Sequence, residues 1–218
     1  MGSCKGILTG IYRLLTIKNI KTIKDPKRGV RDCDIINGMK SLLLTLKAWP
    51  VVTAATIALC YLTKTVAAWL GFDLPDQQNV HIVAHVLENA FASPRHFLGA
   101  AFLVAQIIIL APALEELLFR GLLFKLPIWA TKKIAAHRAT CRLVTVATVL
   151  AALVSATLFS AAHYLPQPWP DAAFLALFFF GLAQCRLYEK TDRIGCPMLL
   201  HALFNLTNLV LLFVIPVE

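Results

Sequence analysis

One apolar run with charged residues in its middle constrains this chain more than any other feature. Residues 97–124 read "FLGAAFLVAQIIILAPALEELLFRGLLF", and the charges are Glu115, Glu116 and Arg120. At the centre of a membrane helix each charged side chain costs about 2.5–3.5 kcal/mol on insertion scales. Membrane chains keep such residues where they pair with one another or serve a function. The run therefore predicts a membrane helix that carries a polar site.

The composition agrees with a membrane-embedded chain. Of the 218 residues, 58% are hydrophobic and only 15% are charged, whereas a soluble domain is about 45–50% apolar and about 25% charged. The first residues lack an uninterrupted apolar core and a small-residue cleavage site, so we expect no secretory signal peptide.

Five apolar spans predict an all-α, polytopic membrane helix bundle of about five transmembrane helices, with amphipathic helices at its surface. The spans are residues 48–70, 97–124, 143–164, 172–187 and 197–215. Each can cover a hydrocarbon core of about 30 Å, the short fourth span only with little tilt.

The spans divide the chain into two predicted parts. Residues 1–47 form a basic amphipathic cytoplasmic segment, in which Asn37-Gly38 predicts a loop. Residues 48–218 form an integral membrane helical domain.

The net charge of +9 predicts the orientation. Ten basic residues precede the first span, and segments 125–142 and 186–196 carry eight more, against Arg95 alone in the segments assigned to the opposite side. By the positive-inside rule, the N-terminus and these two segments are cytoplasmic. We favour this explanation over nucleic-acid binding, and we expect membrane lipids as partners and no nucleic acid.

The charged residues of the second span differ in what they can pair with. Glu116 and Arg120 are four residues apart and share one helix face, whereas Glu115 is turned away by about 100°. We expect Glu116 to be neutralised by the arginine and Glu115 to face the interior of the bundle. A buried carboxyl group without a cationic partner suits proton transfer near neutral pH.

Other polar side chains lie in later spans. His163 ends the third span, and His201 and Asn205 lie four residues apart on one face of the fifth. An imidazole and a carboxamide together can donate to a developing oxyanion. The residues alone leave open that these side chains only tie the helices together.

Three motifs stand in a fixed order along these spans. They are "EELLFRG" at 115–121, "FSAAH" at 159–163 and "HALFN" at 201–205. The pattern Glu-Glu-x-x-x-Arg, Phe-x-x-x-His, His-x-x-x-Asn resembles the type II CAAX prenyl endopeptidase family, also called the CPBP or abortive-infection family of intramembrane proteases. The resemblance covers about residues 98–212, the motif core of the membrane domain.

The resemblance implies a CAAX-type membrane endopeptidase that hydrolyses a peptide bond with glutamate-activated water and uses no cofactor. Glu115 would activate the water with the assistance of His163, and the oxyanion hole would come from His201 and Asn205. The implied orienting and structural residues are Glu116, Arg120 and Phe159.

The resemblance also implies a peptide or protein substrate, either prenylated or a bacteriocin-like precursor, and a place in a bacterial inner membrane. Two alternatives stay open. One is a zinc-dependent membrane metalloprotease with Glu115, His163 and His201 as ligands. The other is a non-catalytic membrane immunity or interaction protein that keeps the motifs as a structural clamp.

The predicted span boundaries conflict with a shared site. Glu115 and His201 fall in the inner half of the membrane, whereas His163, about twenty residues from Arg142, falls near the outer end of its helix. A meeting of the three side chains requires at least one boundary to move.

Overall fold

The computed structural model describes residues 30–74, 83, 85–87, 89, 97–135, 141–164 and 171–214. The chain divides into two compact units, residues 1–39 and 40–218. In the first unit the described part, residues 30–39, is helical. Everything that follows about packing and the site concerns the second unit.

The described residues are almost entirely helical and contain no strand, so the predicted all-α class is confirmed. The helices are α2 (Val30–Trp69), α4 (Phe97–Ala105), η2 (Gln106–Leu110), α5 (Ala111–Glu116), η3 (Leu117–Lys125), α6 (Leu126–Ala135), α7 (Cys141–Ala162), α8 (Ala173–Thr191) and α9 (Gly195–Val214).

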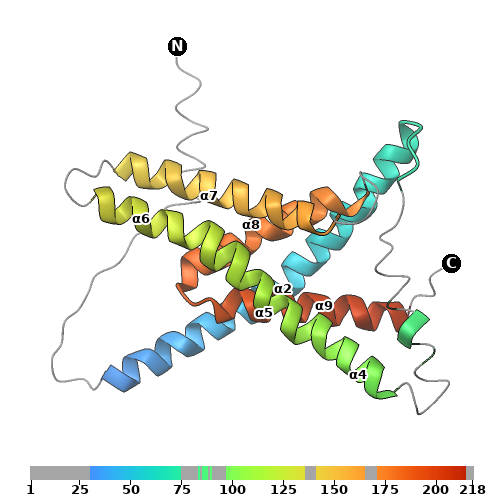
Figure 1. The fold of residues 1–218 in the computed structure, drawn as a ribbon, viewed down its shortest axis with the longest axis horizontal. Coiled ribbons are helices and arrows are strands. Elements are labelled where there is room, and N and C mark those ends of the chain that lie inside the picture. The colour runs from blue at the N-terminus through green and yellow to red at the C-terminus, as the bar shows by residue number, and fades with distance from the viewer. Residues whose placement is uncertain are drawn as a thin grey trace. The chain divides into compact units, whose positions relative to one another are not determined.

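The elements from α4 to α6 follow one another without a break, and we call residues 97–135 the long helix (Figure 1). Its segments η2 and η3 are π-helical. The prediction that this span ends at Phe124 is wrong, because the helix continues to Ala135. The continuation is stabilised by Ile128, which is buried with Phe124, Ala151 and Cys185.

Four helices of the described residues are long and apolar enough to cross a membrane. They cover Ile36–Trp69, Phe97–Ile134, Arg142–Ala162 and Gly195–Leu212. The predicted fourth span corresponds to α8, which does not meet this description because its last turns carry Arg186, Glu189 and Lys190. The chain is thus a helical membrane protein, and the part that the structure describes holds four such helices where five were predicted.

The first helix also differs from its prediction. Helix α2 begins at Val30 instead of near Ala48, and Asn37-Gly38 lies within it, so the loop predicted there is wrong. Asn37 and Gly38 have low helix propensity, but the free-energy cost of two such residues is small compared with the stability of a continuous 40-residue helix. The cytoplasmic assignment of residues 1–47 stays a prediction.

The other helices pack against the two halves of the long helix. Helix α7 packs against η3 and α6, and α9 packs against η2 and α5. Helix α8 packs against α7, α9 and η3. In Figure 1, residues 40–69 of α2, α7 and α9 run from left to right, while the long helix and α8 run from right to left. The last turns of α7 and the second turn of α9 both approach the long helix near its middle, where the rings of Phe159 and His201 lie 5.6 Å apart.

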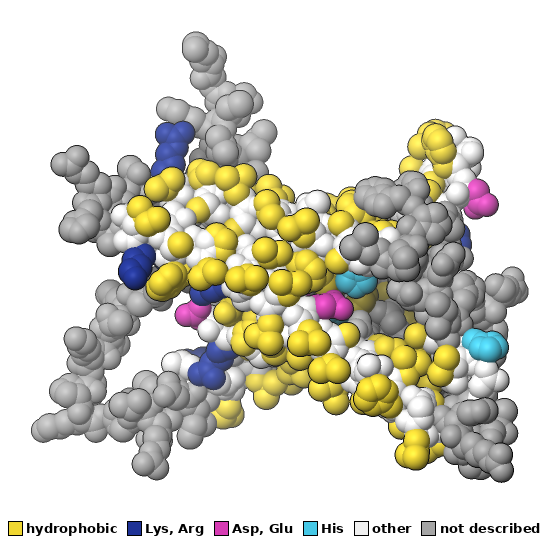
Figure 2. Space-filling view, in the orientation of Figure 1, with side chains coloured by type: hydrophobic (Ala, Val, Ile, Leu, Met, Phe, Trp, Pro, Cys, Tyr) yellow, Lys and Arg dark blue, Asp and Glu magenta, His cyan; other side chains and the backbone are white. Residues whose placement is uncertain are grey.

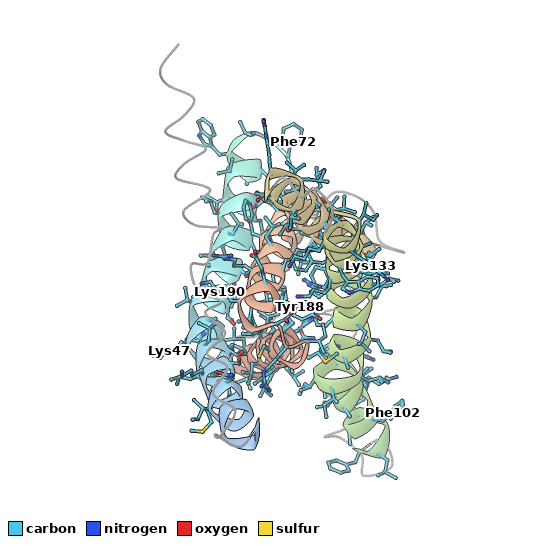
Figure 3. The ribbon with its side chains drawn as sticks, turned by 90° about the vertical axis from the view of Figure 1, so that its left-hand side faces the viewer. Lys47, Phe72, Phe102, Lys133, Tyr188 and Lys190 are labelled. Atoms are coloured by element: carbon cyan, nitrogen blue, oxygen red, sulfur yellow. The ribbon has the colours of Figure 1, made fainter. Side chains whose placement is uncertain are left out.

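Helix α2 joins this assembly through its middle. Leu44, Trp49 and Val52 pack against the buried residues Leu187, Cys196 and Leu200 of α8 and α9. The indole Nε1 of Trp49 donates to Oγ1 of Thr207 at 3.1 Å. Figure 3 shows α2, with Lys47, on one side and the long helix, with Phe102 and Lys133, on the other, with α8 between them.

Candidate active site

The acidic residues of the site end α5, the short α-helical segment between the two π-helical ones. Glu116 is fully buried, and the side chain of Glu115 is 30% exposed. Departures from α-helical register occur frequently at functional sites, because they redirect the side chains that follow. Both glutamates lie where α7, α8 and α9 converge on the long helix.

Glu116 forms the expected ion pair with Arg120. Nε of the arginine lies 3.1 Å from Oε2 of the glutamate, and both side chains are 0% exposed. The guanidinium group also reaches α7 and α8: Nη2 donates to the carbonyl oxygen of Gly181 at 3.5 Å, and Cζ lies 4.3 Å from the centre of the Phe159 ring. The arginine therefore ties three elements together.

The second oxygen of Glu116 binds α9 and α8. Oε1 accepts a hydrogen bond from Nδ1 of His201 at 2.8 Å and one from Nε2 of Gln184 at 3.4 Å. Because Nδ1 of His201 donates to the carboxylate, the other ring nitrogen, Nε2, is left to face the site.

The orientation of His163 follows from the end of α7. The backbone N–H of His163 bonds to the carbonyl of Ser160 at 3.2 Å and so leaves the Phe159 carbonyl free. Nδ1 of the same histidine occupies this carbonyl at 2.8 Å. A carbonyl only accepts, so Nδ1 carries the proton and Nε2 is again the free nitrogen. The rings of Phe159 and His163 also meet edge-on with their centres 4.7 Å apart, a contact that requires an aromatic residue one turn before the histidine and accounts for the four-residue spacing of the Phe-x-x-x-His motif.

The two free imidazole nitrogens converge on Glu115. Its Oε2 lies 3.9 Å from Nε2 of His163 and 3.8 Å from Nε2 of His201. This oxygen is buried and has no hydrogen-bond partner among the described residues. Figure 2 shows an acidic and a histidine side chain close together near the middle of this face, surrounded by hydrophobic residues. The structure therefore brings together the acid and both histidines.

The conflict over depth is resolved by the true end of the long helix. Glu115 lies 20 residues before Ala135, and His163 lies 22 residues after Cys141. At 1.5 Å per residue these lengths are about 30 and 33 Å. Since α7 runs antiparallel to the long helix from that shared end, His163 arrives beside Glu115. The error lay in ending the second span at Phe124.

Asn205 lies one turn beyond His201 on α9 and binds the backbone of the long helix. Its Nδ2 donates to the carbonyl oxygen of Ile107 at 2.9 Å. The carboxamide has a second N–H, which this bond leaves unused.

Sequence reasoning missed three residues that hold this arrangement. Gln184 is fully buried and bonds both to Glu116 and to the carbonyl of Pro197, at 3.2 Å. Ser155 donates to the carbonyl of Phe119 at 2.7 Å, and Gly181 accepts from Arg120. A glutamine inside the apolar stretch "FFFGLAQC" was a signal available in the sequence, because a polar side chain in a membrane span requires partners.

The residues described by the structure include no group of three His, Cys, Asp or Glu side chains arranged to hold a metal ion. The zinc alternative required Glu115, His163 and His201 to form such a group.

The fold and the site define an integral membrane protein in which helices from three parts of the chain deliver carboxylates, imidazoles and an arginine to one buried cluster. The family described as "type II CAAX prenyl endopeptidase Rce1-like" matches this chain over residues 97–207, which is just over half of its length. The chain belongs to this family. No curated protein and no solved structure matches this chain. Family membership implies a membrane-embedded protease that acts on peptide bonds.

Proposed function

We propose that this chain is an intramembrane endopeptidase in which Glu115 activates the attacking water. The observation that carries the proposal is the position of Oε2 of Glu115 between the Nε2 atoms of His163 and His201. At 3.8–3.9 Å these groups do not bond directly, and a water or a substrate atom can bridge separations of this size. The exposed part of the Glu115 side chain gives such a water its route in.

In the proposed reaction, Glu115 takes a proton from the water with the assistance of His163, and the resulting oxygen attacks the peptide carbonyl. The same pair then gives the proton to the leaving amine. The side chains of His201 and Asn205 donate to the oxyanion of the tetrahedral intermediate.

For that donation, Nε2 of His201 must carry a proton in addition to the one on Nδ1. A carboxylate at Nδ1 stabilises such a charged ring, and Glu116 supplies it at 2.8 Å. Arg120 keeps Glu116 in place from the other side. The orienting role that we propose for these two residues is thus to fix the ring of His201.

The substrate class that we propose is a peptide segment reached from the membrane, either near a prenylated C-terminus or in a bacteriocin-like precursor. We further propose a bacterial inner membrane with the N-terminus in the cytoplasm. Two probes separate the substrates: a farnesylated peptide ending in a CAAX sequence, and a non-prenylated library of fluorogenic peptides.

The test is the substitution Glu115→Gln in the full chain, purified in detergent and assayed on both probes beside the unchanged protein. We expect cleavage to fall by about 10²-fold or more, since general-base catalysis contributes about 10²–10⁴, with an unchanged melting midpoint. The matched control is Glu189→Gln on α8, whose carboxylate pairs with Arg186 outside the site. Equal cleavage by Glu115→Gln and the unchanged protein would refute the mechanism.

The same assay decides between the alternatives. Cleavage that survives a zinc chelator removes the metalloprotease, whereas cleavage abolished by the chelator and restored by zinc supports it. A non-catalytic clamp predicts no cleavage by any variant and a lower melting midpoint for Glu116→Ala and Arg120→Ala.

A further inference from the structure

The bond from Asn205 to Ile107 joins a side chain of α9 to the backbone of a helix that should have no free carbonyl there. In an α-helix the carbonyl of Ile107 would accept from the N–H of residue 111. In this chain the N–H of Ala111 bonds to the carbonyl of Gln106 instead, five residues back. Ile107 has thereby lost its α-helical donor.

Proline removes the replacement donor. In the π-helical register the carbonyl of Ile107 would accept from residue 112, and Pro112 has no N–H. The carbonyl is therefore without either donor of its own helix. A buried carbonyl without a partner costs about 1–3 kcal/mol, and in a membrane no water of the hydrocarbon region replaces the bond. The Nδ2 group of Asn205, 2.9 Å away, satisfies it.

The same local pattern occurs a second time, away from the site. Segment η3 ends before Leu126-Pro127, and the N–H of Leu126 bonds to the carbonyl of Gly121, again five residues back. Pro112 is fully buried, whereas Pro127 is exposed. The long helix thus offers one proline beside the acids and a matched proline outside the cluster.

The register at Pro112 decides where the acids point. Successive residues of an α-helix are about 100° apart, so a π-helical turn, which adds one residue, rotates everything after it by about that angle. Glu115 and Glu116 follow Pro112 by three and four residues. The residues of η2 are held in place by their packing on α9. If the helix continued from them in the α-helical register, Glu115 would be rotated by about 100° and would not face both imidazoles.

We propose that Asn205 is a positioning residue whose side chain binds the carbonyl of Ile107, which Pro112 leaves without a backbone donor. By binding Ile107, its carboxamide locks the π-helical register before α5 and so fixes the rotation at which Glu115 faces His163 and His201. This inference rests on the proposed function for its effect on cleavage, but its effect on stability does not.

The test is a double-mutant cycle with Pro112→Ala and Asn205→Ala, measured as melting midpoints of the full chain in detergent. Alone, Asn205→Ala leaves the carbonyl unpaired, and we expect a drop of about 3–8 °C. With Pro112→Ala the long helix can return to the α-helical register, in which the N–H of Ala111 pairs with the carbonyl of Ile107, so adding Asn205→Ala should lower the midpoint by no more than about 1 °C. Equal drops in both backgrounds would overturn the proposal.

Two controls separate this device from general effects. Asn208→Ala removes a carboxamide of α9 that bonds to Phe204 of its own helix at 3.1 Å, and its effect should not depend on Pro112. Pro127→Ala changes the matched proline, and the drop caused by Asn205→Ala should persist in that background. If Pro112→Ala does not fold, Asn205→Leu decides: it keeps about the same size but has no donor, and an unchanged midpoint would contradict the proposal.

Cleavage then distinguishes positioning from donation to an oxyanion. We expect Pro112→Ala to fold with a midpoint at least as high as before and yet to lose at least 10-fold in cleavage, because Glu115 is rotated away. If Asn205 acted solely as an oxyanion donor, Asn205→Ala would lose cleavage and keep its melting midpoint. If no form of the chain cleaves either probe, the proposed function fails, and the midpoints still decide whether the device exists.

Discussion

The ring of Phe159 contacts three polar side chains of the site. It lies 4.3 Å from Cζ of Arg120, and its centre is 4.7 Å from the ring of His163 and 5.6 Å from that of His201, both edge-on. Edge-to-face contacts and a cation over an aromatic face each contribute about 0.5–1.5 kcal/mol. A single fully buried ring therefore sets the angles at which two imidazoles face Glu115.

This geometry predicts that Phe159→Leu harms cleavage more than stability. Leucine keeps an apolar group in the buried site, so we expect a loss of about 1–3 kcal/mol in the free energy of unfolding. Cleavage should fall about 10-fold or more, since small displacements of catalytic groups cost large factors in rate. Melting midpoints and kcat/KM measured side by side test this. The control is Phe179→Leu on α8, whose ring is half-exposed; a kcat/KM equal in all three proteins would contradict the prediction.

At the scale of single residues, much of the site could be predicted from spacing. Glu116 and Arg120 share a face because they are four apart, and Glu115 does not, which is what the contacts show. The bond between His201 and Glu116 could not be predicted, because it joins residues 85 positions apart in sequence. Its existence depends on how α9 packs against α5, and no local pattern encodes that packing.

Helices α7 and α8 approach each other closely near the site, at Gly181 and Ala156. A Cβ atom built on Gly181 would lie 3.0 Å from Cα of Ala156 and 3.5 Å from Nη2 of Arg120. Small residues let membrane helices approach this closely, and the approach brings the carbonyl of Gly181 to the arginine. The packing of α8 on α7 is thus coupled directly to the charged cluster.

We therefore expect Gly181→Ala to separate α7 from α8 and to destabilise the chain by about 1–3 kcal/mol, as overpacking does. Because the neighbouring atom is backbone, neither helix can yield by a side-chain rotation. Gly99→Ala on α4 is the matched control: its Cβ would meet nothing within 4 Å, and alanine favours the helix by about 0.5–1 kcal/mol. Melting midpoints that change equally in the two variants would show that the crossing is not as tight as described.

Hydropathy predicted where most helices lie but not where they end. Helix α2 starts well before the apolar stretch. The long helix passes beyond Lys125 because Ile128 of α6 is buried in a packed cluster, and such a face continues a helix past its hydrophobic core. The π-helical segments were equally invisible, since Pro112 suggests an interruption and not a change of register. The error in the end of the long helix produced the false separation of His163 from Glu115.

In the second unit, the position of the basic side chains agrees with the direction in which the helices run. Figure 2 shows most of the described lysine and arginine side chains of this face toward its left end, where α6 ends and α7 begins in Figure 1. The membrane-spanning part of the long helix, Phe97–Ile134, has 38 residues or a length of about 57 Å, which exceeds a hydrocarbon core of about 30 Å. A helix of that length must tilt or extend beyond the bilayer, which leaves room for its basic end, with Lys132 and Lys133, to reach the headgroups.

The positive-inside rule turns this asymmetry into a prediction about sidedness. Phe72, just after α2, is 65% exposed, and Lys133 lies exposed near the end of α6 (Figure 3). In a chain whose six native cysteines are replaced by serine, we expect Phe72→Cys to react with a membrane-impermeant maleimide in intact cells. Lys133→Cys should react only after permeabilisation, and full labelling of both in detergent serves as the control. The opposite pattern would place the N-terminus outside the cell, and the basic segments would then need another explanation, such as binding to an acidic partner.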